Sequence, residues 1–161
     1  MEIHYSTDGD ITPEELFVLA STQGWGEDRP IDRNNQAIKG SIFVASARHE
    51  GRLVGLLRLV GDGAYCLHVA DFVVHADYRN MGIGSRLLVM SLEYARTQAI
   101  GVDDNIGEFT LFANTPADRL YGRHGFLPVP NGMVLASSER RRRIEEEYNR
   151  SWLEGHSSTP L

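Results

Sequence analysis

Residues 71–88 read DFVVHADYRNMGIGSRLL and join an apolar, strand-like segment directly to a turn that contains two glycines. Arg79 adds a cation to this turn, Gly82 and Gly84 leave it bare of side chains, and apolar residues recur at helical spacing from Ile83 onward. Backbone N–H groups at the start of a helix have no intrahelical partners and carry the positive end of the helix dipole. The stretch therefore predicts a strand, an anion-binding turn and a helix in direct succession.

The two glycines alone fit more than one kind of phosphate site. A nucleotide-binding P-loop ends in Gly-Lys-Ser/Thr, but Gly84 is followed by Ser85 and Arg86. A dinucleotide-binding turn has a third glycine where this chain has Leu87, and it follows a strand that opens a parallel unit rather than one in an antiparallel meander. The P-loop is excluded, the dinucleotide site is disfavoured, and a glycine helix cap without a ligand stays open.

The pattern of strands and helices around this turn predicts an α+β fold. Apolar and alternating runs predict strands at 3–6, 41–48, 52–60, 65–75, 109–113 and 129–136. Helical patterns predict helices at 13–21, 83–99 and 117–124. Between the first helix and the second strand, the sequence predicts a loop over 27–35 and a helical turn near 36–39. The short turns within 41–75 predict an antiparallel meander. The strand, helix and strand between 65 and 113 predict a right-handed parallel unit, so the sheet is expected to be mixed.

The composition is typical of one soluble globular domain. The chain has 161 residues, of which 42% are hydrophobic, and its net charge is −6. Nucleic acids and anionic membranes need a cationic surface, so neither is an expected partner. The single cysteine, Cys66, excludes an internal disulfide and a cysteine metal cluster, and no apolar run reaches the roughly 20 residues that span a bilayer. We expect a cytoplasmic protein that needs no metal.

The sequence predicts a domain over residues 1–137, an amphipathic helix over 138–155 and a flexible tail over 156–161. In the predicted helix, Ile144, Tyr148 and Trp152 recur at four-residue intervals. Its four consecutive arginines precede three glutamates, which argues against DNA binding. We therefore expect the helix to dock on its own domain or on a second copy, which would make a homodimer.

A second motif lies further along the chain, from Leu111 to Phe126, and reads LFANTPADRLYGRHGF. It follows the first motif, V-H-x-D-Y-R-x-x-G-x-G at 74–84, at a separation that leaves room for one helix and one loop. The ordered pair resembles the GNAT superfamily of acyl-CoA-dependent N-acyltransferases. The order of elements from Ile3 to Ala136 is similar to that family's, which implies a mainly antiparallel sheet with a splayed pair of parallel strands at the cofactor site.

The resemblance implies that acetyl-CoA binds along the strand and the glycine turn. Backbone groups of Phe72, Val73 and Val74 are then expected to pair with the pantetheine arm. The pyrophosphate is expected at main-chain N–H groups of the turn, with a hydroxyl added at its end, over Arg79, Asn80, Met81, Gly82, Ile83, Gly84 and Ser85. Asn114 is expected to contact the cofactor from the neighbouring strand.

Three side chains are candidates for proton transfer. The resemblance implies Tyr121 as the general acid for the departing thiolate, with simple packing of the ring as the alternative. Asp71 lies in an apolar strand and is a candidate base, because burial raises the pKa of an unpaired carboxyl group; an ion pair with Arg58 is the alternative. His68 is another candidate base. In a regular strand its side chain and that of Asp71 point to different faces.

The resemblance also implies where the acceptor binds. Trp25, Glu27 and Asp28 lie in the early loop and are candidate contacts to a cationic amine. The predicted function is transfer of an acetyl group from acetyl-CoA to a primary amine, directly within a ternary complex. A covalent route through Cys66 is disfavoured because its sequence neighbours supply no activating partner. The alternative function is a non-catalytic module that binds or senses acyl-CoA.

Overall fold

The structure is a computed structural model that describes residues 1–25, 29–99, 108–113 and 117–128. The chain divides into two compact units, Met1–Phe126 and Leu127–Leu161, and only the first two residues of the second unit are described. The strand expected at 129–136, the helix at 138–155 and the tail at 156–161 lie outside the described residues. The domain boundary at 137 and the homodimer contact fall there too and stay predictions.

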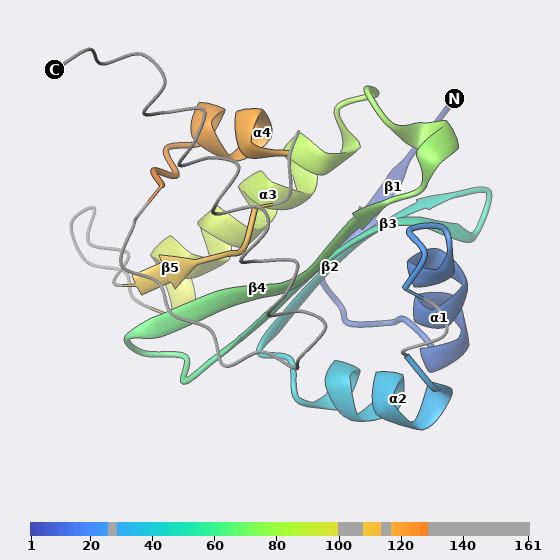
Figure 1. The fold of residues 1–161 in the computed structure, drawn as a ribbon, viewed down its shortest axis with the longest axis horizontal. Helices are drawn as coiled ribbons and strands as arrows, with labels where there is room; N and C mark the ends of the chain where they lie inside the picture. Colours follow the sequence, from blue (N-terminus) through green and yellow to red (C-terminus); the bar gives the residue numbers. More distant parts are fainter. Residues whose placement is uncertain (26–28, 100–107, 114–116, 129–161) are drawn as a thin grey trace, which may run out of the picture. The chain divides into compact units, whose positions relative to one another are not determined.

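The first unit is built on a mixed sheet whose strands are hydrogen-bonded in the order β1-β2-β3-β4-β5. The strands are β1 (His4–Ser6), β2 (Phe43–His49), β3 (Arg52–Gly61), β4 (Cys66–Val74) and β5 (Glu108–Thr110). The pairs from β1 to β4 are antiparallel, whereas β4 and β5 are parallel. Both the predicted meander and the predicted parallel unit are confirmed (Figure 1).

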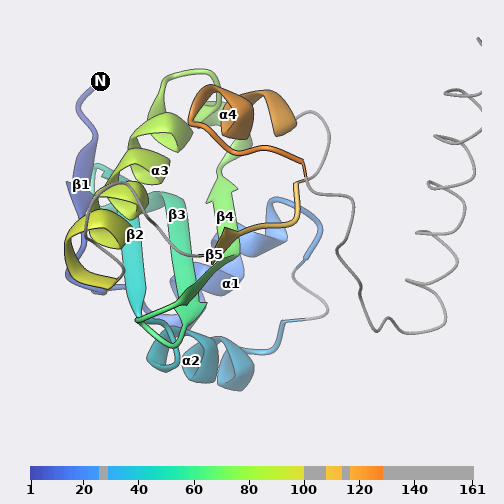
Figure 2. The same cartoon turned by 90° about the vertical axis from the view of Figure 1, so that its left-hand side faces the viewer.

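Helices cover both faces of this sheet. They are α1 (Pro13–Ser21), α2 (Ile31–Lys39), α3 (Ile83–Tyr94) and α4 (Asp118–Arg123), with short turns η1 (Ala76–Tyr78) and η2 (Ala95–Ala99). Figures 1 and 2 show α1 and α2 on one face and α3 and α4 on the other. Each face has its own core: Leu16 and Leu19 pack beneath α1, and Leu87 and Leu88 pack beneath α3. We call these two sides the α1–α2 face and the α3 face.

The prediction for residues 27–35 as a loop is wrong from Ile31 onward, because α2 begins there. Pro30 occupies the N-cap with φ −62°, a value that suits entry into a helix, and Asp32 in the first turn favours the helix dipole. The buried residue of this helix is polar: the Asn34 side-chain amide donates to the carbonyl of Pro13 at 3.3 Å. A polar residue on the buried side removes the apolar periodicity that predicts a helix.

A bulge interrupts β4 at Ala70. Arg58 of β3 pairs with Asp71 and the next residue, Leu59, pairs with Val69, so Ala70 has no partner of its own. As a result the alternation of faces reverses along β4. Val69 packs in the core beneath α3, whereas Val73 packs in the core beneath α1. In a regular strand these two side chains would lie on the same face.

None of the helices that the structure describes has both the length and the apolar character that crossing a bilayer requires. The cytoplasmic location stays a prediction.

Candidate active site

The parallel pairing of β4 with β5 is short. Its ladder runs from Cys66 to His68 on β4 and ends at Thr110 on β5, while β4 continues to Val74. Within the described residues, the edge of β4 after the bulge therefore has no strand beside it on the β5 side. Such an edge offers backbone N–H and C=O groups to an extended ligand, as in β-strand addition. Phe72, Val73 and Val74 lie on this edge, where the sequence predicts the pantetheine arm.

The glycine turn, which we define as residues 79–84, connects this edge to α3. Asn80 and Gly82 both adopt left-handed backbone conformations, with φ of 62° and 79°. Gly82 is the N-cap of α3, and in the described part of the chain no side chain caps the helix and no acidic residue lies in its first turn. The N–H groups of this helix start are therefore left for a ligand, and the dipole favours an anion there.

Gly82 provides a test of the turn. Gly82→Val is expected to raise the dissociation constant for CoA at least about tenfold, because valine at φ 79° costs about 1–3 kcal/mol and the turn relaxes to a different backbone conformation. Isothermal titration calorimetry with CoA measures this. Gly63→Val is the matched control, since Gly63 has φ 74° and equally open surroundings in the turn before β4. Equal affinities for CoA in the two variants would contradict a role for the glycine turn.

Side chains within the glycine turn and directly after it connect it to neighbouring elements. The Arg79 guanidinium donates to Oε1 of Gln23, just after α1, at 2.5 Å, and to the carbonyl of Val74 at 3.4 Å. Ser85 Oγ lies 2.7 Å from Nε2 of His124, which joins the first turn of α3 to the end of α4. Met81 is largely exposed. The turn is thus tied to both faces of the sheet.

Tyr121 of α4 lies on the α3 face. Its ring packs against Phe72 and Phe126, with ring centroids 5.9 and 6.0 Å away, and only 8% of the residue is exposed. Its hydroxyl has no hydrogen-bond partner in the part of the chain that the structure describes. Burial raises the pKa of Tyr121 above its ordinary value, so the phenol keeps its proton at neutral pH and is available as a donor.

His68 of β4 is hydrogen-bonded to Thr110. Thr110 Oγ1 lies 2.9 Å from Nδ1 of His68 and 3.3 Å from the carbonyl of Leu67, so when its proton goes to that carbonyl it accepts from Nδ1. In this tautomer Nε2 of the neutral ring carries a lone pair, and it has no partner among the described residues. Burial lowers the pKa of His68, which keeps the ring neutral at physiological pH. These are the properties of a general base.

His68 and Asp71 lie on the same face of the sheet, not on different faces as a regular strand would place them. Val69 faces α3, so its neighbour His68 faces away from α3. The bulge at Ala70 then turns Asp71 toward the same α1–α2 face, where Arg29 meets it. The expectation of opposite faces applied to a regular strand, and the extra residue at Ala70 makes β4 irregular.

Asp71 is the shared carboxylate of two arginines. Its side chain is 1% exposed; Oδ2 accepts from Nε of Arg58 at 2.8 Å and Oδ1 accepts from Nη1 of Arg29 at 2.5 Å. We call these three residues the Asp71 triad. The predicted ion pair with Arg58 is confirmed. Arg29 was missed, because an arginine in a polar loop carries no pattern that points to a strand far along the chain.

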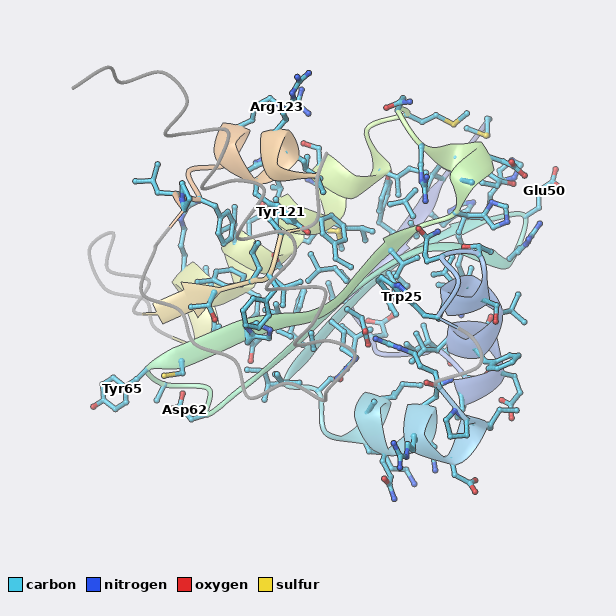
Figure 3. The ribbon with its side chains drawn as sticks, in the orientation of Figure 1. Trp25, Glu50, Asp62, Tyr65, Tyr121 and Arg123 are labelled. Carbon is cyan, nitrogen blue, oxygen red and sulfur yellow. The ribbon has the colours of Figure 1, made fainter. Side chains whose placement is uncertain are left out.

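Trp25 follows α1 and packs against the core of the α1–α2 face. The guanidinium carbon of Arg29 lies 5.0 Å from the centre of its ring, a cation–π contact. Figure 3 labels Trp25 and Tyr121 on opposite sides of β4. The other expected acceptor contacts, Glu27 and Asp28, and the expected cofactor contact Asn114 lie outside the described residues.

The arrangement places the candidate acid and the candidate base on the two faces of one strand. Tyr121 and the start of α3 are on the α3 face, whereas His68 and the Asp71 triad are on the α1–α2 face. The unpaired edge of β4 runs between them. Two reactants that approach from the two faces can thus meet at this edge, one beside a proton donor and the other beside a proton acceptor. The described residues include no group of three His, Cys, Asp or Glu side chains that could hold a metal ion, and the reaction without a metal stays a prediction.

Comparisons with known proteins identify the family of this chain. A family model described as the acetyltransferase (GNAT) family matches residues 12–126. A soybean (Glycine max) protein named histone acetyltransferase TAP1 is 29% identical over 143 residues, which are 82% of this chain. The chain spans only 59% of the length of that relative.

Solved structures show the same fold. A GNAT-family acetyltransferase from Streptococcus pneumoniae superposes with a TM-score of 0.69 at 24% identity, over 85% of this chain and 99% of its own. The PaiA N-acetyltransferase from Thermoplasma acidophilum, solved in complex with coenzyme A, has a TM-score of 0.65 at 16% identity, over 82% of this chain and 94% of its own.

Proposed function

Because the chain belongs to the GNAT family of acetyltransferases, we propose that it moves an acetyl group from acetyl-CoA to a primary amine by direct transfer within a ternary complex. The observation that carries this proposal is one continuous run of backbone. The unpaired edge of β4 leads into the glycine turn and then into the uncapped start of α3. An extended arm that ends in a pyrophosphate has matching groups along this whole run.

The side chains support a simple proton balance for the transfer. The amine nitrogen attacks the thioester carbonyl carbon, a C–N bond forms and the C–S bond breaks. His68 accepts the proton that the amine loses, at Nε2, and the Tyr121 hydroxyl gives a proton to the departing thiolate. The lowered pKa of His68 and the raised pKa of Tyr121 keep both groups in the required protonation state near neutral pH.

His68→Gln tests the base. The variant is expected to lower kcat about 100-fold, within the range for general acid–base catalysis. Burial lowers the pKa of His68, so the neutral ring persists to lower pH. The fall in wild-type kcat that protonation of His68 causes, the acid limb of the profile, is therefore expected below pH about 6.5. That limb should vanish in the variant. Profiles of kcat against pH with one acceptor measure both effects, since ionisation of the acceptor is common to the two enzymes.

Thr110→Val is the companion variant for this test, because it removes the acceptor that holds Nδ1 of His68. A smaller loss of kcat is expected, since the ring keeps its base but loses its preferred tautomer. An unchanged acid limb in His68→Gln would remove His68 from the mechanism.

An amine panel tests the proposed function. The purified protein is incubated with acetyl-CoA and amino acids, polyamines, aminoglycosides and lysine peptides, and free thiol and acetylated product are measured together. Equal amounts of thiol and product with at least one amine are expected. Binding of CoA without transfer to any amine would instead favour the non-catalytic module.

A further inference from the structure

Arg29 is held in place by two contacts, yet part of its guanidinium makes no hydrogen bond within the described part of the chain. Nη1 donates to Asp71 at 2.5 Å and the guanidinium carbon lies 5.0 Å from the centre of the Trp25 ring. The side chain is 31% exposed. Nε and Nη2 have no hydrogen-bond partner among the residues that the structure describes. An arginine fixed in this way presents donors in a preset direction without losing further side-chain entropy.

The Asp71 triad carries an excess positive charge. Arg29 and Arg58 share one carboxylate, and both oxygens of that carboxylate are already used. Arg58 also donates from Nη1 to the carbonyl of Ala37 and to the hydroxyl of Ser41, so it is directed into the protein. His68 on the same face is kept neutral by its lowered pKa. Among the described residues, the positive charge is therefore available at Arg29, which is the more exposed of the two arginines.

The position of Arg29 connects this charge to the reaction. Its partner Asp71 directly follows the bulge at Ala70, on the same face as the proposed base His68. An acceptor whose amine reaches His68 would thus have Arg29 on the same face of the sheet. Carboxylates are the planar anions that a guanidinium fork binds best in a small molecule, whereas a polyamine or an aminoglycoside would be repelled.

We propose that Arg29 is a specificity-determining residue that binds a carboxylate of the acceptor, so that the acceptor is a small amine that carries a carboxylate, as amino acids do. This proposal rests on the proposed acetyl transfer. Arg29 would thereby favour amines that carry a carboxylate over the polycationic and carboxylate-free amines that the same fold would otherwise admit.

Matched acceptors test the proposal. For each amino acid that is acetylated, kcat/KM is compared with that of its carboxamide, which keeps the amine and removes the negative charge. The wild type is expected to prefer the carboxylate at least about tenfold, mainly through KM. In Arg29→Gln this preference should fall to near unity. Arg29→Lys keeps the charge without the fork and should retain an intermediate preference.

Arg33→Gln is the matched control, because Arg33 is exposed on α2 and its replacement should leave the preference unchanged. A purely structural role of Arg29 would lower kcat/KM for acid and amide equally, which would overturn the proposal. The double variant Glu27→Gln/Asp28→Asn should keep the preference, because the carboxylates of Glu27 and Asp28 cannot bind a carboxylate of the acceptor. Loss of the preference in this double variant would also overturn the proposal.

Failure of this proposal can be told from failure of the proposed function. Transfer to carboxamides and polyamines as fast as to amino acids would overturn the role of Arg29 and leave acetyl transfer intact. CoA binding with no transfer to any amine would overturn both. Thermal melting of each variant identifies one that does not fold, and Arg29→Lys then carries the test.

Discussion

Replacement of Tyr121 by phenylalanine is expected to lower kcat for acetyl transfer about 100-fold, near the lower end of the contribution of a general acid. The melting temperature should stay close to that of the wild type. The ring of Tyr121 keeps its contacts with Phe72 and Phe126, and the hydroxyl that is removed leaves no described group without a partner. Stopped or continuous assays of thiol release at saturating acetyl-CoA and acceptor measure kcat directly.

Tyr94→Phe is the matched control for this variant. Tyr94 also packs against the core of the α3 face, where it stacks on Phe43 at 4.7 Å, but it lies at the end of α3 that is remote from the glycine turn. Its replacement removes the same atom and should leave kcat unchanged. If Tyr121→Phe turns over as fast as the wild type, a solvent proton serves the leaving group and Tyr121 is only a packed side chain.

Asp71→Asn is expected to cost about 3 kcal/mol of the free energy of unfolding, near the lower end for breaking a buried ion pair from one side. Asparagine keeps the volume of the side chain but leaves the guanidinium of Arg58, which is 9% exposed, without its counter-charge. Arg29 is 31% exposed and can turn toward water, which limits the loss. Urea unfolding followed by circular dichroism measures the difference.

Asp77→Asn is the control, because the Asp77 side chain is 81% exposed and its replacement should change stability by less than about 0.5 kcal/mol. The experiment also separates the two interpretations of Asp71. If the variant has wild-type stability and loses only the acid limb of its pH profile, Asp71 is the base. We propose the structural role, since both carboxylate oxygens are already held by arginines.

Patterns within short segments predicted most of the fold. The capping box of Thr12 and Glu15 and the proline after Thr12 start α1 as local chemistry requires. Gly82 is the last residue before α3 and has φ 79°, a conformation that glycine adopts at no steric cost. Such signals act over a few residues, so they are readable without knowledge of the partners. The α2 helix was misjudged because its buried position is an asparagine whose partner, the Pro13 carbonyl, lies in another helix.

The strand, glycine turn and helix start over residues 71–88 could be predicted from the sequence, because a helix start and a glycine act through their own backbone; the anion site that we propose there rests on the same local features. The rest of the candidate site depended on the folded chain. One extra residue at Ala70 puts His68 and Asp71 on one face, and Thr110 contacts Nδ1 of His68 from a strand 42 residues away. Arg29 reaches Asp71 across the same separation in sequence. Charge, register and hydrogen bonding at this site are set by contacts between distant segments, and such contacts leave no periodic signal in either segment.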